Sequence, residues 1–495
     1  MNSRRDFIKT TLAGSAGLLL PHYAFGTSQH PIKGANDRIN VAVIGVKDWG
    51  RTHIAAYKSQ PQDVRIVAVC DCDSFYLNRE LANFEKENLK VLGYKDLREL
   101  YENKDVDAVS VVTPNYWHAL ATIWACQAGK HVTVEKPISH SIWEGRKMVE
   151  AARKYDRLVQ ADLDTRSNTS VAAAIDYMHK NLGEIRYVRI VNYKRRMSMG
   201  KVTGPGPIPK TVDYNLHSGP IAMAPLPRKN LHYDWHWQWR TGNAELGNNG
   251  GHQLDFCRWA LRKSTLPKTA ISFGGRYGYI DDGTVPNTQV VWYDYDGIPV
   301  IYESRALGES TGIDNMDGFK GVTATGKKIY HPYKGDANCD MFIFCENGYL
   351  NYESIYDNDG KQVKKFDEPQ VGPQFNFIKA LKSGKKEELK IDILEGHTSV
   401  ILSHIGNISY QTGKQVSLEE LQKTMHEYKY MDDILAGFEE HLRLNGLNPA
   451  KEELYMGLPL HFDLPTEKFI GEHADEANLF LKDSYREPFV IPEKI

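Results

Sequence analysis

The sequence lacks the features that mark several classes of protein. Its six cysteines are scattered over 495 residues without a CxxC pair, so neither a disulfide framework nor a metal site is indicated, and we interpret them as small core residues. A net charge of -2 and the lack of a long Lys/Arg block argue against a nucleic-acid binder. No internal repeat stands out. What remains is an ordinary globular composition, long enough for two domains, for which a soluble enzyme is the default hypothesis.

The N-terminus carries a short targeting pattern. Arg4 and Arg5 precede an apolar run over 11–20 that is too short for a membrane span, and a polar stretch follows. This pattern predicts a twin-arginine export signal over residues 1–30, a periplasmic location, and no membrane span in the mature protein. We therefore leave these residues out of the prediction of the fold.

The chain then turns to a strand, turn, helix and strand pattern. An apolar run over 39–45 ends at Gly45, a helix-compatible segment leads to Lys58, and a second apolar run over 65–71 ends at Asp71. This is how a dinucleotide-binding βαβ unit begins. An aspartate at that point accepts hydrogen bonds from ribose hydroxyls and repels a 2′-phosphate, so the pattern favours NAD over NADP.

The glycine fingerprint of this unit is incomplete. Lys47 stands where the middle glycine is usual, and it either points outward or meets the pyrophosphate. The cofactor-binding candidates in this unit are Gly45, Lys47, Trp49, Gly50 and Asp71.

Further strands and helices alternate downstream. We predict a strand over 107–114, a helix over 117–128 and a strand over 131–137, which together imply a parallel sheet with ligands at the carboxyl ends of its strands. The residues expected at those ends, and thus at the cofactor, are Thr113, Asn115, His118, Glu135 and Lys136.

Two later stretches combine aromatic and polar residues. Aromatic residues alternate with polar ones over 231–240, which, if extended, sends tryptophans to one face and hydrogen-bonding groups to the other. Such a surface suits a polyhydroxylated ligand, although aromatic stripes are as often core. A glycine-rich turn is predicted over 247–251, with His252 directly after it.

Together these motifs resemble the Gfo/Idh/MocA family of NAD(P)-dependent sugar and cyclitol oxidoreductases. The resemblance covers residues from about Arg38 to about Gly413 and includes Glu-Lys-Pro at 135–137. Its closest form is an exported branch with Trp-His-Trp, here 235–237, and a Gly-Asn-x-Gly-x-His-Gln-Leu-Asp motif, here 247–255.

The resemblance implies an α/β architecture with NAD as cofactor. It divides the chain into a Rossmann domain over 38–163 and an α+β domain over 164–413, which is built on a large open, mostly antiparallel sheet, and it leaves a helix-rich extension and tail over 414–495. The open face of that sheet is expected to form a homo-oligomer.

The resemblance also assigns catalytic roles. Lys136 is expected to lie beside the nicotinamide and to hydrogen-bond the reacting hydroxyl, where a cation stabilises alkoxide character. His252 is the expected general base. Many members carry an aspartate four residues before this histidine, and here Asn248 replaces it, so we expect Asn248 to orient substrate or imidazole while Asp255 or Glu245 supplies charge.

The expected substrate wall comes from two segments. Asp164 and Arg166 follow a strand ending near 161 and either contact sugar hydroxyls or form a salt bridge at the domain hinge. His397 and His404 share one face of a predicted helix. We interpret both as packed side chains, with His397 the better candidate of the two for the substrate cleft. The other substrate-wall candidates are Asp234, Trp235, His236 and Trp239.

We therefore predict an NAD-dependent oxidoreductase that oxidises a secondary ring hydroxyl, at C3, of a sugar or glycoside. Because free NAD is scarce outside the cytoplasm, a second sugar or keto-sugar is expected to recycle a tightly held cofactor. Two alternatives stay open. One is a redox-neutral glycosidase that works through a 3-keto intermediate, and the other is a non-catalytic sugar-binding protein on a dehydrogenase scaffold.

Overall fold

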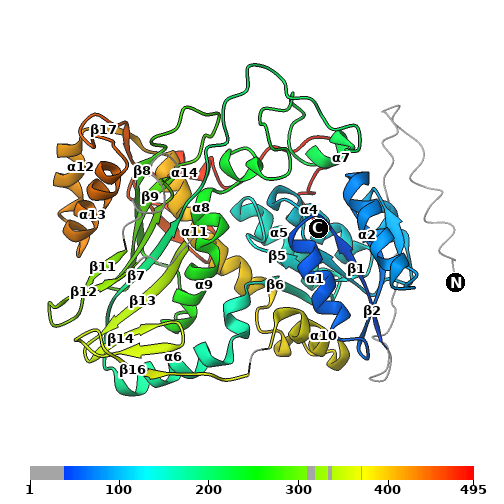
Figure 1. Ribbon diagram of the computed structural model, residues 1–495, viewed down its shortest axis with the longest axis horizontal. Coiled ribbons are helices and arrows are strands. Elements are labelled where there is room, and N and C mark those ends of the chain that lie inside the picture. The colour runs from blue at the N-terminus through cyan, green and yellow to red at the C-terminus, as the bar shows by residue number, and fades with distance from the viewer. Residues whose placement is uncertain (1–37, 309–317, 333–336, 370) are drawn as a thin grey trace, which may run out of the picture.

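The structure is a computed structural model that describes residues 38–308, 318–332, 337–369 and 371–495 (Figure 1). The predicted export signal over 1–30 lies outside these described residues. Within the described ranges, no helix has both the length and the apolarity that a membrane crossing requires. Two bodies lie side by side, each built on one sheet (Figure 1).

The first body is a six-stranded parallel sheet in the order β3-β2-β1-β4-β5-β6. The strand order reverses direction between β1 and β4, the point at which folds of this type bind their ligands. The strands are β1 (Ile39–Ile44), β2 (Val64–Cys70), β3 (Leu92–Tyr94), β4 (Ala108–Val111), β5 (His131–Glu135) and β6 (Val159–Asp162). The helices are α1 (Trp49–Lys58), α2 (Ser74–Lys86), α3 (Leu97–Glu102), α4 (Asn115–Gln127) and α5 (Ile142–Lys154). The predicted Rossmann arrangement is confirmed.

The second body is a ten-stranded sheet in the order β16-β15-β14-β13-β7-β10-β9-β8-β18-β17. Only β7 and β10 pair in parallel among its described pairs, so the prediction of a mostly antiparallel sheet is confirmed. The strands are β7 (Ile185–Lys194), β8 (Thr269–Gly275), β9 (Thr288–Tyr295), β10 (Ile298–Arg305), β13 (Ala337–Cys345), β14 (Gly348–Asn351), β15 (Ser354–Tyr356), β16 (Gln362–Lys365), β17 (Lys414–Val416) and β18 (Leu454–Met456).

One face of this sheet is covered by helices, of which α8 and α9 carry residues of the site. They are α6 (Thr169–Asn181), α8 (Ala244–Asn248), α9 (Gly250–Ala260) and α11 (Ile393–Gln411). Alternate strand residues such as Val291, Tyr293 and Val300 pack with Leu254 and Ile401 of these helices, as the period-two pattern of a strand requires.

The opposite face, which the resemblance implies to be open, is covered by the chain itself. Helices α12 (Leu418–Met425) and α13 (Met431–Leu444) pack Leu421 and Phe438 onto Phe273, Val290 and Ile301. A hairpin of β11 (Phe319–Val322) and β12 (Lys328–His331) covers β7 and β13 beside them. The face that was expected to be open is therefore covered over its central strands by these elements, and the homo-oligomer stays a prediction.

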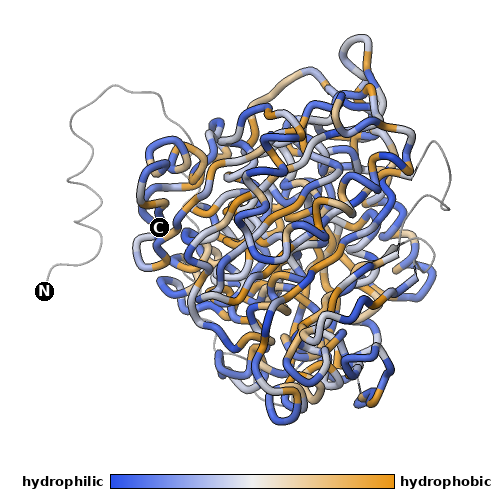
Figure 2. Tube along the Cα trace, turned by 90° about the vertical axis from the view of Figure 1, so that its left-hand side faces the viewer, coloured by the Kyte–Doolittle hydropathy of each residue, from blue (hydrophilic) through white to orange (hydrophobic). Residues whose placement is uncertain are grey.

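Two segments return from the second body to the Rossmann domain. Helix α10 (Pro373–Ser383) packs Phe377 and Leu381 against the β1 side, and the tail places Phe489 and Ile491 in the core around α4. The tail also contains a two-stranded sheet, β19 (His461–Asp463) with β20 (Lys468–Ile470), and the short helix α14 (Ala474–Asn478). In Figure 2 the outer loops are mostly hydrophilic, and hydrophobic segments run through the body.

A long connection, residues 195–243, follows β7 and crosses over the top of the molecule (Figure 1). It holds α7 (Tyr214–Ser218) and a 3-10 helix, η2 (Asp234–Trp237). The predicted extended conformation over 231–240 is wrong, because η2 turns the chain there and removes the two-residue alternation. Trp237 is buried, whereas Tyr233 is exposed.

Candidate active site

A cavity of about 550 Å³ lies where the carboxyl ends of β1, β2, β4 and β5 face α8, α9 and the 195–243 connection. A volume of this size suits a cofactor with a small substrate. Of the predicted site residues, those that line it are Gly45, Lys47, Trp49, Gly50, Asp71, Thr113, Asn115, Glu135, Lys136, Asp164, Trp235, His236, Asn248 and His252.

The turn from β1 into α1 is shaped by two glycines. Gly45 has φ +86°, and an added Cβ would lie 2.4 Å from the carbonyl oxygen of Val112. A Cβ on Gly50 would lie 1.9 Å from the carbonyl oxygen of Gly45. Both positions require glycine because neighbouring backbone fills the space that a side chain would need.

Lys47 does not block this turn. Its ammonium group lies 2.5 Å from the carboxylate of Asp48, and its carbonyl oxygen accepts a hydrogen bond from Arg79. Asp48 precedes α1 without capping it through its side chain, and the N–H of Arg51 donates to the carbonyl oxygen of Asp48, so the N–H groups of Trp49 and Gly50 are the ones that an anion can reach at this end of the helix.

These features fit NAD. The glycine turn leaves room for a pyrophosphate, and Asp71, held by the backbone N–H groups of Val46 and Asp73, stands at the end of β2 where a ribose is expected. Two buried oxygens on lining residues, Oγ1 of Thr113 and Oδ1 of Asn115, lack a hydrogen-bond partner. Unpaired buried oxygens of this kind suit a polar ligand.

Lys136 and His252 both face the cavity from opposite domains. Nζ of Lys136 donates hydrogen bonds to the backbone oxygen of Asn248 at 3.0 Å and to its Oδ1 at 3.2 Å. Burial lowers the pKa of Lys136, and the carboxylates of Glu135 and Glu245 oppose that shift. The contact between Lys136 and Asn248 thus joins the end of β5 to α8.

His252 does not follow a glycine turn. Residues 247–251 belong to α8, α9 and their junction, and His252 lies in the first turn of α9. Gly247 and Gly250 serve close packing instead, since an added Cβ would lie 2.4 Å from the Cβ of Asn243 and 2.9 Å from the ring of Tyr302, whereas Gly251 has open space around it. Nδ1 of His252 lies 3.2 Å from Oδ1 of Asp164, an ion-pair distance without hydrogen-bond alignment. This pairing lowers the pKa of Asp164.

Of the two expected sources of charge, only Glu245 reaches Asn248. Its carboxylate forms two hydrogen bonds with Arg196, at 2.8 and 2.9 Å, and accepts one from Nδ2 of Asn248 at 3.4 Å. Burial would raise the pKa of Glu245, but Arg196 outweighs it and holds the pKa low. Asp255 instead binds Arg166 in a bidentate pair, at 2.7 to 3.1 Å.

The structure places four predicted site residues away from the cavity lining. The side chain of Arg166 points toward Asp255 of the second domain and forms a salt bridge with it. Of the two roles expected for Arg166, this is the salt bridge. Asp234 is buried and accepts a hydrogen bond from the backbone of Asn230. Trp239 lines a separate cavity of about 130 Å³. His118 is buried, and its ring nitrogens contact the carbonyl oxygens of Thr113 and Pro137, so it fixes the strand ends that flank Lys136.

Trp235 and His236 form one wall. Their rings stack at 3.6 Å between centroids, and Nδ1 of His236 contacts the carbonyl oxygen of Tyr233. Burial lowers the pKa of His236 to about 3, so it stays neutral. His397, by contrast, is buried against Glu467, and His404 lines the smaller cavity, so neither lines the main one.

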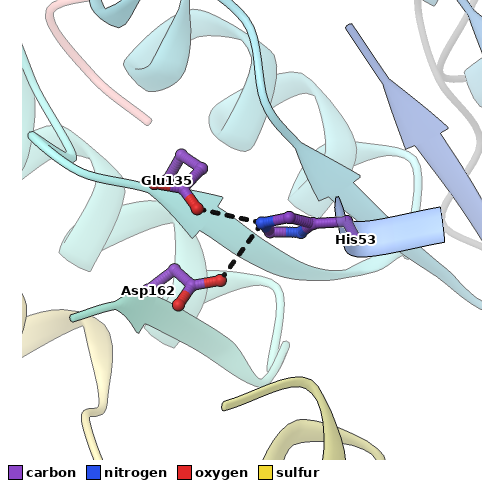
Figure 3. A group of neighbouring side chains, drawn as sticks. All are labelled: His53, Glu135 and Asp162. Carbon is purple, nitrogen blue, oxygen red and sulfur yellow. Dashed lines mark hydrogen bonds and ion pairs between the residues drawn. The ribbon is translucent and has the colours of Figure 1, made fainter. Parts of the chain in front are cut away.

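A buried acid–base cluster that was not predicted from the sequence is formed by His53, Glu135 and Asp162, of which Glu135 lines the cavity (Figure 3). Nε2 of His53, from α1, lies 2.9 Å from Glu135 and 3.5 Å from Asp162. Burial and the charge of Glu135 raise the pKa of Asp162 to about 8. Burial would lower the pKa of His53, but both carboxyl groups outweigh it and raise it.

This cluster supports Glu135 and, through it, the cavity. Glu135 also accepts hydrogen bonds from the indole of Trp49 at 2.6 Å and from the backbone N–H of Lys136 at 3.1 Å. The donor atoms of His53, Glu135 and Asp162 lie close enough together to hold a metal ion. The neighbouring hydrogen bonds already satisfy them, with Gln374 donating to Asp162 at 2.8 Å and Ser110 2.7 Å from His53.

Lys194, Arg196 and Asn243 also line the cavity and were not predicted. Lys194 is the last residue of β7, and Arg196 follows it by two positions. Basic residues at the end of a predicted strand were the sequence signal that could have identified them. Asn243 accepts a hydrogen bond from Asn115, which joins the Rossmann domain to the 195–243 connection.

Residues 39–163 match the profile of Gfo/Idh/MocA, described as an oxidoreductase family with an NAD-binding Rossmann fold. The N-terminal domain belongs to this family. The predicted family is confirmed for this domain, and the same match confirms the predicted cofactor, NAD.

Among curated relatives, the chain is 28% identical over 205 residues to a glycosyl hydrolase family 109 protein of Shewanella baltica (strain OS185). This match covers 38% of the chain and 42% of the relative, so less than half of either is shared at the sequence level.

Two solved structures show the fold over most of the chain. The WlbA dehydrogenase of Bordetella pertussis, in complex with NADH and UDP-GlcNAcA, has a TM-score of 0.53 at 17% identity and covers 74% of this chain and 94% of its own. The aldose-aldose oxidoreductase of Caulobacter crescentus has a TM-score of 0.52 at 16% identity, covering 74% and 96%.

Proposed function

We propose that this protein is an NAD-dependent oxidoreductase that oxidises a secondary ring hydroxyl of a sugar or glycoside, at C3. The observation that carries the proposal is the convergence of Lys136 and His252 on one cavity that also contains the glycine turn and Asp71. A cation, an imidazole and a cofactor site in one enclosed space are what oxidation of a carbinol needs.

When bound, NAD supplies a nicotinamide ring that accepts the hydride from the carbinol carbon. Lys136 donates a hydrogen bond to the carbinol oxygen and stabilises the negative charge that develops there. His252 accepts the hydroxyl proton, and Asp164 lies beside the resulting imidazolium. In the reverse direction His252 returns the proton.

Several features support a sugar as substrate. The wall made by Trp235 and His236 offers a flat aromatic surface beside neutral hydrogen-bonding groups. Of the two solved structures described above, one contains UDP-GlcNAcA and the other is an aldose-aldose oxidoreductase. The latter also supports recycling of the cofactor by a second sugar or keto-sugar in the same cavity.

The near-ultraviolet absorbance of the purified protein, recorded before and after addition of methyl glucosides, tests the proposal. We expect reduced nicotinamide to appear, and His252→Ala to slow its appearance by about 100-fold, the usual contribution of a general base. Near-normal turnover in His252→Ala would remove the base from this position. A protein that holds no nucleotide, even after denaturation, would favour the sugar-binding alternative.

A redox-neutral glycosidase is the second candidate, favoured by the similarity to a glycosyl hydrolase family 109 protein. A ketone at C3 acidifies the C2 proton, so a base removes that proton, the C1 substituent leaves, and water adds at C1. Reduction of the ketone then restores the cofactor. Release of nitrophenol from a p-nitrophenyl glycoside by the purified protein, without added oxidant, supports this candidate, and formation of the keto-glycoside alone supports the first.

We also propose that the protein is exported by the twin-arginine route to the periplasm, on the basis of Arg4, Arg5 and the short apolar run after them. Replacing both arginines with lysine should retain the protein in the cytoplasmic fraction of the expressing cells. Unchanged periplasmic recovery would contradict this route.

A further inference from the structure

The 195–243 connection forms the wall of the cavity that faces Asp71. Leu216, His217 and His232 from this connection line the cavity together with Asp71 and Cys72 at the end of β2. In the βαβ unit of a Rossmann domain, this is the end of the site where the ribose of the dinucleotide is expected. In Figure 1, α7 of the connection lies over the Rossmann domain near α4.

The connection is attached to the turn between β2 and α2 by backbone hydrogen bonds. The N–H of Ser74 donates to the carbonyl oxygen of Thr211 at 2.9 Å, and the N–H of Asp213 donates to that of Cys72 at 3.0 Å. Between these two bonds, Asp73 and Val212 pair as an antiparallel bridge. These contacts fix which residue of the connection lies opposite which residue of the turn, as the register does between paired strands.

A side-chain ion pair adds to this attachment. Nε2 of His232 lies 2.9 Å from Oδ2 of Asp73, at hydrogen-bond distance. Asp73 is buried and His232 mostly buried, so water screens their pairing less than it screens a surface pair.

Helix α4 holds the same segment from the other side. The hydroxyl of Tyr116 donates to the carbonyl oxygen of His217, and the indole of Trp117 donates to that of Leu216, each at 3.0 Å. Gly219, with φ +50°, packs so closely on Trp117 that an added Cβ would lie 2.2 Å from its ring.

The tail secures the outer side of the connection. The guanidinium group of Arg486 donates to the carbonyl oxygens of Asn215 at 2.7 Å and Ile221 at 3.0 Å. Inside, Val212, Leu226 and Leu231 form a small hydrophobic core of their own. The segment is thus anchored at three places on the Rossmann side.

We infer that residues 211–217 and His232 form a clasp over the ribose end of the cofactor site, so that the clasp must open before the cofactor leaves. The inference rests on the proposed function, which identifies the ligand as NAD. The clasp would hold the cofactor in its site while a second sugar reoxidises it. Because opening breaks the contacts at Asp73 and Arg486, those contacts set the rate of release.

The rate at which NADH leaves the full-length protein tests the clasp. The protein is loaded with NADH and mixed with excess NAD, and the decay of bound-NADH fluorescence gives the release rate without any sugar. We expect His232→Ala and Arg486→Ala each to release NADH at least about tenfold faster than wild type, and His232→Gln to restore part of the retention. His426→Ala is the control, since it removes a histidine–aspartate contact of similar length, 2.8 Å to Asp432, at an exposed position on the far side of the second domain.

Equal release rates for wild type, His232→Ala and Arg486→Ala would overturn the clasp, whether or not sugar is oxidised. Slow release that these variants accelerate, in a protein that oxidises no sugar, would uphold the clasp and remove the proposed function. If His232→Ala does not fold, as judged by its melting temperature, Arg486→Ala decides, because its side chain lies outside the cavity.

Discussion

At the scale of single residues, the pairing of His252 with Asp164 replaces the pairing that the resemblance implies. The usual aspartate is Asn248, which cannot titrate and instead accepts hydrogen bonds from Lys136. Asp164 approaches His252 from the segment directly after β6, at the start of the second domain. Its side chain is 64% exposed, so its effect on stability should be small and its effect on orientation of the imidazole larger.

We expect Asp164→Asn to lower kcat by about tenfold with little change in KM, because an amide neither orients nor stabilises an imidazolium as a carboxylate does. Asp164→Glu should recover part of the rate. In a His252→Ala background, Asp164→Asn should have no further effect on kcat, since the two side chains act as one unit. A fully additive loss in the double variant would show that Asp164 acts elsewhere.

A second prediction concerns Asp162 and the pH dependence of stability. Its pKa in the folded protein is raised to about 8, above the ordinary value of 3.8, so the native state keeps a proton that the unfolded chain loses. The contribution of Asp162 to the free energy of unfolding is therefore fully present at acid pH. It falls as pH rises from about 4 to about 8, by at most about 1.4 kcal/mol per pH unit. The raised pKa of His53 acts in the same direction, since its contribution is lost as pH rises through that value.

Asp162→Asn keeps the neutral form at every pH, so the free energy of unfolding should fall less steeply between pH 6 and 8 in the variant than in wild type. Urea unfolding at pH 6, 7 and 8 measures the slopes. Asp176→Asn, at an exposed position paired with Arg262, is the control and should leave the wild-type slope unchanged. Equal slopes for Asp162→Asn and wild type would mean that Asp162 is ionised in the native state.

The contrast between these residues shows what the sequence could predict. Lys136 could be found because a short motif places it directly after a strand, and local sequence decides strand ends. The cluster of His53, Glu135 and Asp162 could not, because its histidine lies 82 positions from its first partner and each residue looks ordinary alone. Only the order of β1, β4, β5 and β6 brings them together.

At the scale of elements, the turn from β1 to α1 keeps the backbone of a dinucleotide site despite the loss of its middle glycine. We expect Gly50→Ala to abolish the bound nucleotide and to cost about 1–3 kcal/mol, because its Cβ meets backbone that has no room to move. Lys47→Gly should retain the nucleotide. Nucleotide released on denaturation and the melting temperature measure both effects, with Gly204→Ala, which has open space around it, as control.

If Gly50→Ala keeps both its nucleotide and its melting temperature, the close approach of α1 to Gly45 is not required. Long regular elements such as β9, β10 and α11 were predictable because their periodicity extends over several turns or pleats. The segment 231–240 was not, because alternation over ten residues is also compatible with a folded connection, and here Asp234 and its contact with Asn230 turn the chain.

At the scale of the whole molecule, the extension over 414–495 changes what the second sheet can do. Nothing in the composition of α12 and α13 marks them as a cover for a sheet, since an amphipathic helix packs equally well on any apolar face. In the structure they occupy the face on which association was expected. The central strands of the sheet are therefore covered on both sides by the chain itself, whereas the edge strand β16 is exposed.

This arrangement makes a prediction for Phe438, which is 1% exposed and lies edge-on to Phe273 with 5.4 Å between ring centroids. Phe438→Ala should lower the free energy of unfolding by about 3–5 kcal/mol and loosen α13 from the sheet. The uncovered face should then cause concentration-dependent association, measured by sedimentation velocity. Phe375→Ala, at an exposed position on α10, should change neither quantity. If wild type already associates and Phe438→Ala abolishes that association, then α13 itself forms the contact between chains, and the sheet beneath it only supports the helix.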